Sequence, residues 1–216
     1  MGNLQSGGLF SRMAPKRLFN DKIDRNLRGL LEKLPEGNIG YAIVGLNTLF
    51  YGLYLLWPKS NMFAFYNNFT FSHFGLKQGC LHNMVTCHFA QMSAFHWLLD
   101  SIISFMFCRN LSMMFGNVFV AKTVLLSMFL GTFFVFMKEA ALGVVPPFNG
   151  NDAILRGLIF SLIISNPQAK LMLFPIPVNI PAWAIAALLL GLDFFTFNSA
   201  GFGGVSAAYL MVNFFM

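Results

Sequence analysis

The sequence predicts an all-α membrane protein with six transmembrane helices, and three observations support this fold class. Hydrophobic residues make up 56% of the 216-residue chain and charged residues only 10%, whereas soluble domains carry about 25% charged residues. Six apolar stretches alternate with polar or proline-containing segments. A basic, amphipathic segment precedes the first of them. This composition leaves too little polar surface to cover a water-exposed globule, so we expect the chain to be embedded in a bilayer.

The chain divides into an N-terminal segment, residues 1–38, and a transmembrane domain, residues 39–216. Residues 18–34 have the pattern of an amphipathic helix that Pro35 and Gly37 end. Its apolar residues share one face: Leu18, Ile23, Leu27, Leu30, Leu31 and Leu34. Acid-before-base pairs four residues apart, Asp21 with Arg25 and Asp24 with Arg28, favour the helix. Two interpretations stay open, namely a helix lying among lipid headgroups and a contact for a partner subunit.

The expected spans are residues 39–57, 92–108, 118–137, 152–165, 180–197 and 202–215. Several are short for a bilayer core of about 30 Å, which implies a thinned membrane or burial within a helix bundle. The connection over residues 58–91 is too polar to span but rich in aromatic residues. Connections of this length are usually functional or interfacial, so we expect it to lie half-submerged at the membrane surface.

Basic residues are concentrated before the first span. Seven of the fourteen lie there: Arg12, Lys16, Arg17, Lys22, Arg25, Arg28 and Lys33. Such a cluster places the N-terminus in the cytoplasm or matrix and indicates contact with anionic lipids. No basic patch interleaved with aromatic residues follows, so nucleic acid is not an expected partner.

Two targeting patterns compete at the N-terminus. Met1 to Ser6 fits the myristoylation pattern at Gly2, and the acid-free, basic start of residues 1–15 resembles a mitochondrial address. The three cysteines form no even disulfide framework. Cys80 and Cys87, with His82 and His88, match no familiar zinc spacing, so we expect neither a metal nor another cofactor.

Three stretches resemble the rhomboid family of intramembrane proteases, particularly its mitochondrial branch. The first is the segment 86–100, Thr-Cys-His-Phe-Ala-Gln-Met-Ser-Ala-Phe-His-Trp-Leu-Leu-Asp. It is similar to the family's Phe-x-His-x-x-x-x-His-x-x-x-Asn run at the second span. His96 matches the second histidine, whereas Gln91 and Asp100 replace the first histidine and the asparagine. In the family these polar groups help to hold the oxyanion.

The other two stretches carry the family's catalytic positions. Pro146 to Ile154 resembles the Gly-x-Ser-Gly-Ala-Ile segment that opens the fourth span, with Asn151 at the serine position. Residues 200–205, Ala-Gly-Phe-Gly-Gly-Val, resemble the Ala-His-Leu-Gly-Gly segment of the sixth span, with Gly201 at the histidine position. The connector over residues 166–174 also agrees. The derlins, the nearest alternative relatives, have a Trp-Arg pair that is missing here.

The resemblance therefore implies a pseudoprotease rather than an enzyme. An acyl-transfer protease needs a nucleophile and a base that takes its proton. The amide of Asn151 cannot ionise to a nucleophile, and Gly201 has no side chain to accept a proton. Other hydroxyls, such as Ser93 and Ser101, have no matching base nearby in the sequence.

Charged residues inside the expected spans predict a buried polar network. Its expected members are His96, Asp100, Asp152 and Arg156, because His96 with Asp100 and Asp152 with Arg156 are four residues apart. The network either fills the former active site or forms a proton path or ligand pocket there. Partners for Lys122 and Asp193 are left open. Small residues at Gly201, Gly204 and Ala208 predict close helix packing, which the resemblance places against the fourth span.

The leading functional expectation is a non-catalytic structural subunit of a larger membrane complex. The mitochondrial inner membrane is the expected location, with ATP synthase or a respiratory-chain complex as the assembly. The alternative is a client-binding inactive rhomboid in the endoplasmic reticulum membrane. A glycosylation sequon at Asn68-Phe69-Thr70 would favour that alternative.

Overall fold

The computed structural model describes residues 21–143, 146–168, 170–172 and 179–215. The long helices are α2 (Ile39–Leu56), α6 (Ala94–Phe115), α7 (Asn117–Leu142), α8 (Asp152–Ser165), α9 (Ala182–Phe195) and α10 (Ser199–Phe215). The shorter elements are α1 (Asp21–Leu31), η2 (Pro35–Gly37), η3 (Lys59–Asn61), α3 (Met62–Phe69), α4 (His73–Lys77), α5 (Asn83–Thr86), β1 (Lys170–Met172) and β2 (Asn179–Pro181). The described part of the chain is thus almost entirely helical.

Helices α2, α6 and α7 are long and apolar enough to cross a membrane. They contain 18, 22 and 26 residues. Helices α8 and α9 contain 14 residues each and α10 contains 17. Fourteen helical residues extend about 21 Å, less than the hydrocarbon core of about 30 Å. Three of the six expected spans therefore meet the length and composition of a membrane crossing.

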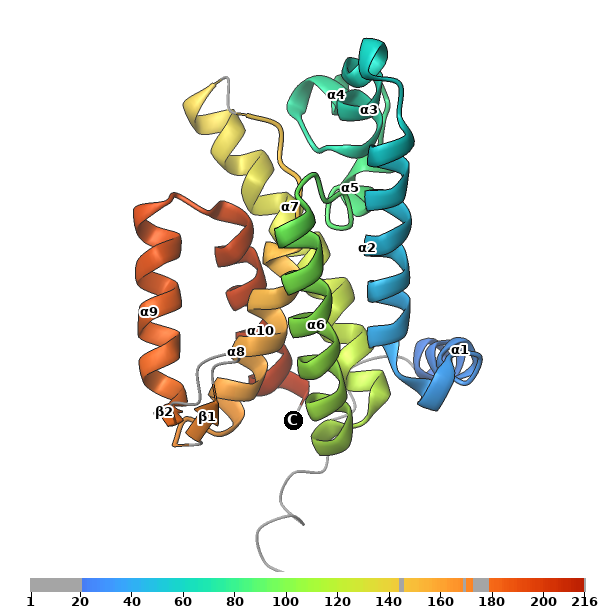
Figure 1. Ribbon diagram of the computed structural model, residues 1–216. Coiled ribbons are helices and arrows are strands. Elements are labelled where there is room, and N and C mark those ends of the chain that lie inside the picture. The colour runs from blue at the N-terminus through green and yellow to red at the C-terminus, as the bar shows by residue number, and fades with distance from the viewer. Residues whose placement is uncertain (1–20, 144–145, 169, 173–178, 216) are drawn as a thin grey trace, which may run out of the picture.

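Helix α8 lies at the centre of the bundle and contacts α6, α7, α9 and α10 (Figure 1). Burial is almost continuous along it: Ala153, Ile154, Leu155 and Gly157 through Ile163 are buried. Helix α2 packs on α6, on the opposite side of the bundle from α9. Most of α8 is apolar, because a helix surrounded by other helices has no polar face, and its charged residues are Asp152 and Arg156.

The two ends of the bundle differ. Helix α1 lies beside one end of α2, and the long connection with α3, α4 and α5 lies at the other end (Figure 1). Phe71 of this connection pairs through its backbone N–H and carbonyl with Phe148, both bonds being 2.8 Å long. Phe65 and Phe71 are buried, whereas Phe63 and Phe74 are exposed. The aromatic residues of this connection therefore both fill its interior and line its outer surface.

The second expected span ends too early in the sequence-based prediction. Arg109 and Asn110 suggest a boundary there, but α6 continues to Phe115. Charged and amide side chains do not break a helix when they are exposed at its end, and both residues are exposed. The helix ends at Gly116, whose φ of 84° is a conformation that favours glycine. The connector after α8 contains an antiparallel pair in which Lys170 lies opposite Pro181.

Helix α1 forms within the predicted amphipathic segment and is attached to α7. Asp24 forms a salt bridge with Lys122. The Asn117 side chain donates to the Glu36 carbonyl at 3.3 Å, and Leu31 is buried. Lys122 thus has a partner within the chain. The two targeting patterns, in residues 1–15, lie outside the described residues.

Candidate functional site

Asn151 lies directly before α8, at the position that the rhomboid resemblance assigns to the serine. Its side chain is 1% exposed. The Asn151 amide donates to the Ser104 hydroxyl of α6 at 2.7 Å. The preceding segment is held by a bond of 2.8 Å from the Gly150 N–H to the Cys87 carbonyl. Asn151 is therefore a fixed, buried donor that ties α8 to α6.

Gly201 lies in the first turn of α10, at the position that the resemblance assigns to the histidine. A Cβ atom built on Gly201 would lie 2.6 Å from Oδ2 of Asp193 and 2.8 Å from its Cγ. Such distances are too short for non-bonded atoms. The Asp193 carboxylate of α9 therefore occupies the space that any side chain at position 201 would need.

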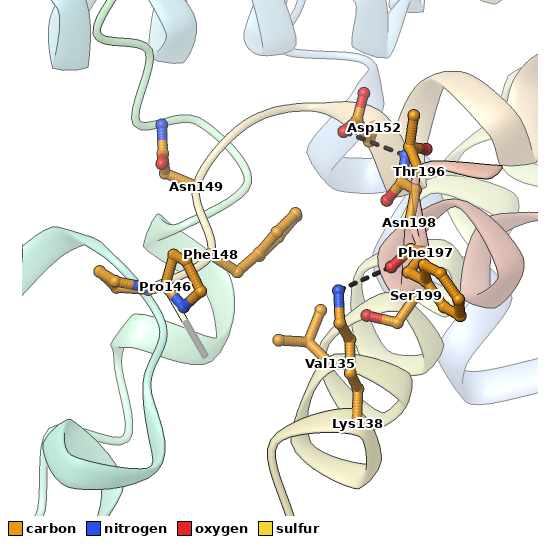
Figure 2. Close-up of a pocket in the computed structure, with 11 residues that line it drawn as sticks. Val135, Lys138, Pro146, Phe148, Asn149, Asp152, Thr196, Phe197, Asn198 and Ser199 are labelled. Atoms are coloured by element: carbon orange, nitrogen blue, oxygen red, sulfur yellow. Dashed lines mark hydrogen bonds between the residues drawn. The ribbon is translucent and has the colours of Figure 1, made fainter. Parts of the chain in front are cut away.

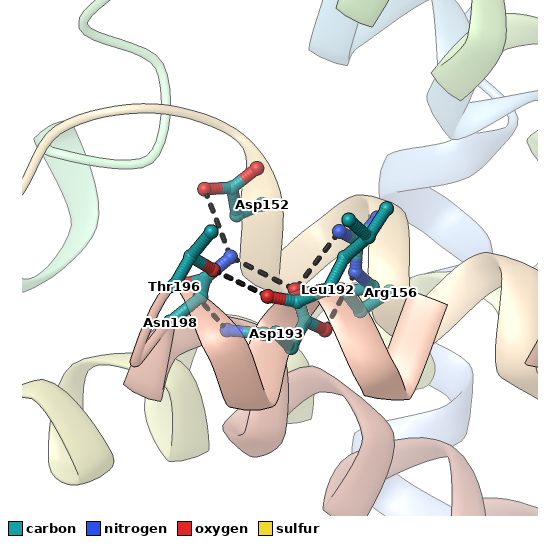
Figure 3. Close-up of polar contacts among 7 residues, drawn as sticks. Asp152, Arg156, Leu192, Asp193, Thr196 and Asn198 are labelled. Carbon is teal, nitrogen blue, oxygen red and sulfur yellow. Dashed lines mark hydrogen bonds and ion pairs between the residues drawn. The ribbon is translucent and has the colours of Figure 1, made fainter. Parts of the chain in front are cut away.

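Asp193 is held there by Arg156 of α8 and by Asn198. Arg156 donates from Nε and Nη2 to the two carboxylate oxygens at 2.8 and 2.9 Å (Figure 3). This is the bidentate geometry that makes arginine–carboxylate pairs strong. Asn198 donates to Asp193 at 3.2 Å and to Asp152 at 3.3 Å. Its Oδ1 accepts from the Gly201 N–H at 3.1 Å, so the same side chain also fixes the start of α10.

The expected network differs from the observed one in its pairing. Arg156 pairs with Asp193 of α9, not with Asp152 four residues before it. Asp100 accepts from Gln91 at 2.8 Å. Asp152 accepts from Asn198, whereas His96 is exposed on α6 and not part of a buried network. Printed bonds connect Asp152, Arg156, Asp193 and Asn198, which we define as the polar cluster.

No local sequence pattern pointed to the pair that dominates this cluster. Arg156 and Asp193 are 37 positions apart in the sequence, beyond the reach of any helical spacing. The signal that was available is the cost of a charge in a span, which requires Asp193 to have a partner somewhere in the bundle.

A pocket of about 360 Å³ lies beside the polar cluster, between the segment before α8 and the turn between α9 and α10 (Figure 2). Phe148, Asp152 and Asn198 line it, whereas Asn151 and Gly201 do not. Lys138 closes one side by donating to the Phe197 carbonyl at 2.7 Å. The two positions that the rhomboid resemblance assigns to catalytic residues are therefore filled by protein, and the open space lies next to them.

Cys87 and His88 precede α6 and are both fully buried. Burial raises the pKa of the Cys87 thiol to about 12 and lowers the pKa of His88 to about 4. His88 Nε2 lies 3.0 Å from the Met128 carbonyl oxygen and 2.9 Å from the Thr132 hydroxyl. A carbonyl only accepts, so Nε2 carries the ring proton. The pair is an inert thiol and a neutral imidazole, and the described residues contain no group of three or more potential metal ligands.

Gly204 and Ala208 lie where α10 packs on α8, as the small-residue pattern suggested. A Cβ atom on Gly204 would lie 2.2 Å from the Ala153 carbonyl oxygen, and Ala208 is fully buried in a cluster with Ile159 and Phe160. Gly201 has a different neighbour, the carboxylate of Asp193. Of these three small residues, Gly201 therefore makes room for a side chain from α9 instead of bringing the α8 and α10 backbones together.

Together, the fold and the site define a helical membrane protein whose buried centre is a set of ion pairs and amides. The described residues show no hydroxyl or thiol paired with a base in this centre. Among curated proteins the chain is similar to "RHOMBOID-like protein 12, mitochondrial" of Arabidopsis thaliana, with 26% identity over 185 residues. The match covers 78% of this chain and 53% of the relative, so the chain spans about half the length of the protein it matches.

No family model matches the sequence. The similarity to the Arabidopsis protein supports a rhomboid-like membrane protein, in agreement with the motifs around His96, Asn151 and Gly201.

Proposed function

We propose that this chain is a non-catalytic rhomboid-like protein that serves as a structural subunit of a larger membrane assembly. One observation supports the proposed absence of catalysis: the Asp193 carboxylate fills the space that a side chain at position 201 would need. A histidine at position 201 would collide with this carboxylate, and displacing the carboxylate would break its bidentate pair with Arg156. The polar cluster thus stabilises the bundle in place of a catalytic dyad.

The proposed bundle has six spans, in which α8, α9 and α10 complete the set formed by α2, α6 and α7. Burial supports the inclusion of α8, because protein surrounds this short helix and no lipid has to match its length. The outer surface of α9 is apolar, with exposed Trp183, Leu188 and Phe195. A helix of 14 residues with such a surface favours a locally thinned membrane or cover by another subunit.

The proposed location is the mitochondrial inner membrane. The printed name of the Arabidopsis relative includes the word mitochondrial, and the basic N-terminal segment suits a matrix-facing end. The secretory alternative depends on the sequon at Asn68. Asn68 lies within α3, where its amide donates to the Ala64 carbonyl at 2.7 Å, and Thr70 is buried. A glycosylation acceptor belongs on an accessible surface loop, so this geometry disfavours that alternative.

The proposed assembly is an energy-converting complex, ATP synthase or a respiratory-chain complex. Charged residues make up only 10% of the chain, and α8 and α9 are short helices that suit a bilayer of altered thickness. These two properties fit a subunit that fills and shapes the membrane part of a complex. The step to a particular complex rests on analogy.

Native-gel electrophoresis of detergent-solubilised membranes tests the proposal. Mitochondrial and microsomal fractions from the same cells would be compared, with antibodies against the chain and against core subunits of each oxidative-phosphorylation complex. We expect the chain in the mitochondrial fraction, migrating with one of these complexes. Migration as a free species, or recovery in microsomes in a form that a glycosidase shifts, would refute the proposal.

A further inference from the structure

Helix α1 has an apolar stripe that the bundle covers only along one edge. At about 100° per residue, Ile23, Leu27, Leu30 and Leu31 fall on one side of the helix. Leu31 is buried and Leu27 is half-buried, whereas Ile23 is 45% and Leu30 is 61% exposed. The edge with Leu31 packs on the bundle, and the edge with Ile23 and Leu30 stays open.

The attachment of α1 fixes which edge stays open. Asp24, next to the Leu31 edge on the helix surface, forms its salt bridge with Lys122 of α7. Beyond the helix, Asn117 holds the Glu36 carbonyl. Rotating α1 to bury Ile23 and Leu30 against the bundle would break the bond to Lys122. The open apolar edge is therefore built into the folded chain.

The position of α1 places this edge at a membrane boundary. Helix α2, which begins at Ile39, is long and apolar enough to cross the bilayer. Figure 1 shows α1 beside this starting end of α2 and turned across its direction. When α2 crosses a bilayer, a helix in this position runs along the membrane surface at which α2 enters the bilayer.

The exposed charges on and just after α1 include more bases than acids. The bases are Arg25, Arg28 and Lys33, and the acids are Glu32 and Glu36. At about 100° per residue, Arg25 and Arg28 both lie roughly opposite the open apolar edge, as in helices that rest in a lipid interface. Arg109, near the C-terminal end of α6, is also exposed. Headgroups with a negative charge complement such a surface.

We propose that α1 is a docking surface for an acidic membrane leaflet. Ile23 and Leu30 insert at the boundary between headgroups and acyl chains, and Arg25 and Arg28 interact with anionic lipid phosphates. The surface would hold the matrix or cytoplasmic end of the bundle at a fixed depth. Its occupant is the bilayer itself, so it does not depend on the identity of the proposed complex.

Spin labels on the full-length purified protein in nanodiscs test this proposal. Leu30→Cys reports on the open edge, and Gly29→Cys is the matched control, because a Cβ atom on Gly29 has no neighbour within 4 Å. Cys80 would be replaced by serine in both, since Cys87 and Cys108 are buried. With phosphatidylglycerol present, we expect the label at position 30 to collide mainly with oxygen. The label at position 29 should collide mainly with a water-soluble nickel complex.

The lipid dependence separates an acidic leaflet from any apolar surface. Two changes should each release the label at position 30 from the membrane: replacing phosphatidylglycerol by phosphatidylcholine, and introducing Arg25→Gln with Arg28→Gln. In each case we expect the ratio of oxygen to nickel collisions at position 30 to fall by a factor on the order of ten. Equal exposure to nickel at positions 29 and 30 would overturn the membrane docking. Immersion unchanged by lipid charge and by the two substitutions would overturn the role of acidic lipid.

Discussion

The seam between α8 and α10 and the attachment of α9 show two different ways of holding helices together. At the seam, Gly204 leaves no room for a Cβ atom against the Ala153 carbonyl, and α8 is buried along almost its whole length. Gly157 and Gly203 lie equally close to α7. In α9 only Ala182, Ile185 and Asp193 are buried. The seam is held by backbones in contact. Helix α9 has a smaller apolar contact, and its one charged residue is bound to α8.

This difference explains where polar residues are placed in the membrane domain. Small residues allow close approach without buried charge, so the seam is insensitive to ion pairing. Helix α9 meets the bundle over a smaller area and uses the bidentate bond between Arg156 and Asp193. The missing side chain at Gly201 makes room for that bond. The glycine at position 201 and the attachment of α9 are thus two aspects of one arrangement.

The largest expected effect comes from filling the seam. Gly204→Leu places a Cβ atom against the Ala153 carbonyl oxygen, which cannot move without shifting α8. We expect a loss of at least about 4 kcal/mol, or no folded protein, because overpacking against backbone has no flexible neighbour to absorb it. Thermal unfolding in detergent, followed by circular dichroism, measures the change.

Gly191→Leu is the matched control for this substitution. It lies on α9, and a Cβ atom there meets nothing within 4 Å. We expect a change within about 0.5 kcal/mol. If the two leucine variants unfold at the same temperature, close packing does not distinguish the seam from α9.

The next effect comes from breaking the attachment of α9. Arg156→Leu leaves the Asp193 carboxylate, whose side chain is 1% exposed, without its cation. We expect a loss of roughly 3–4 kcal/mol, since removing one partner of a buried pair leaves an uncompensated charge. Arg156→Leu combined with Asp193→Leu should recover much of this loss. An Arg156→Leu variant as stable as the parent would show that the pair does not hold α9.

The third effect is a dependence of stability on pH that originates at His88. Its pKa is lowered to about 4 in the folded state, below the ordinary value of about 6.5. The unfolded chain therefore binds a proton first as pH falls. The contribution of His88 to the free energy of unfolding should be constant above pH 6.5, decrease as the pH falls from 6.5 to 4, and stay constant below pH 4. The total loss should be roughly 3 kcal/mol.

His88→Gln keeps a donor for the Met128 carbonyl but does not titrate. Chemical unfolding between pH 4 and 8 should show a smaller decrease for this variant than for the parent. Identical pH profiles for the two proteins would assign the dependence to other groups. Because His88 lies next to Gly131, where a Cβ atom would be 3.3 Å from its ring, the effect belongs to the tightly packed part of the bundle.

The sequence predicted most of the long helices well, because the length of an apolar stretch is a strong signal for a helix. The stretches over residues 39–57 and 152–165 agree closely with α2 and α8. The end of α6 was wrong because polarity was taken as a boundary, whereas the change in backbone conformation occurs at Gly116. Composition reports where a chain becomes polar, and helices end where the backbone requires it.

The residues of the site were predictable only in part, and its bonds were not. Motif resemblance located Asn151 and Gly201 and placed Gln91 and Asp100 at two polar positions of the family, and these two side chains share a hydrogen bond. The spacing of Asp152 and Arg156 suggested a local pair, but Arg156 reaches Asp193 instead. Asn198 supplies the alternative donor to Asp152. Competition among several partners is decided by the three-dimensional arrangement, which helical spacing does not contain.

Incubation of the purified protein with a transmembrane reporter peptide most directly tests the central proposal that the chain is non-catalytic, with Asn151 and Gly201 at the two positions of the rhomboid dyad and the Asp193 carboxylate in the space at Gly201. We expect background cleavage only, equal for the parent and for Asn151→Ala. Turnover above background that is abolished by a substitution in the chain itself, such as His96→Ala or Ser104→Ala, would contradict this account.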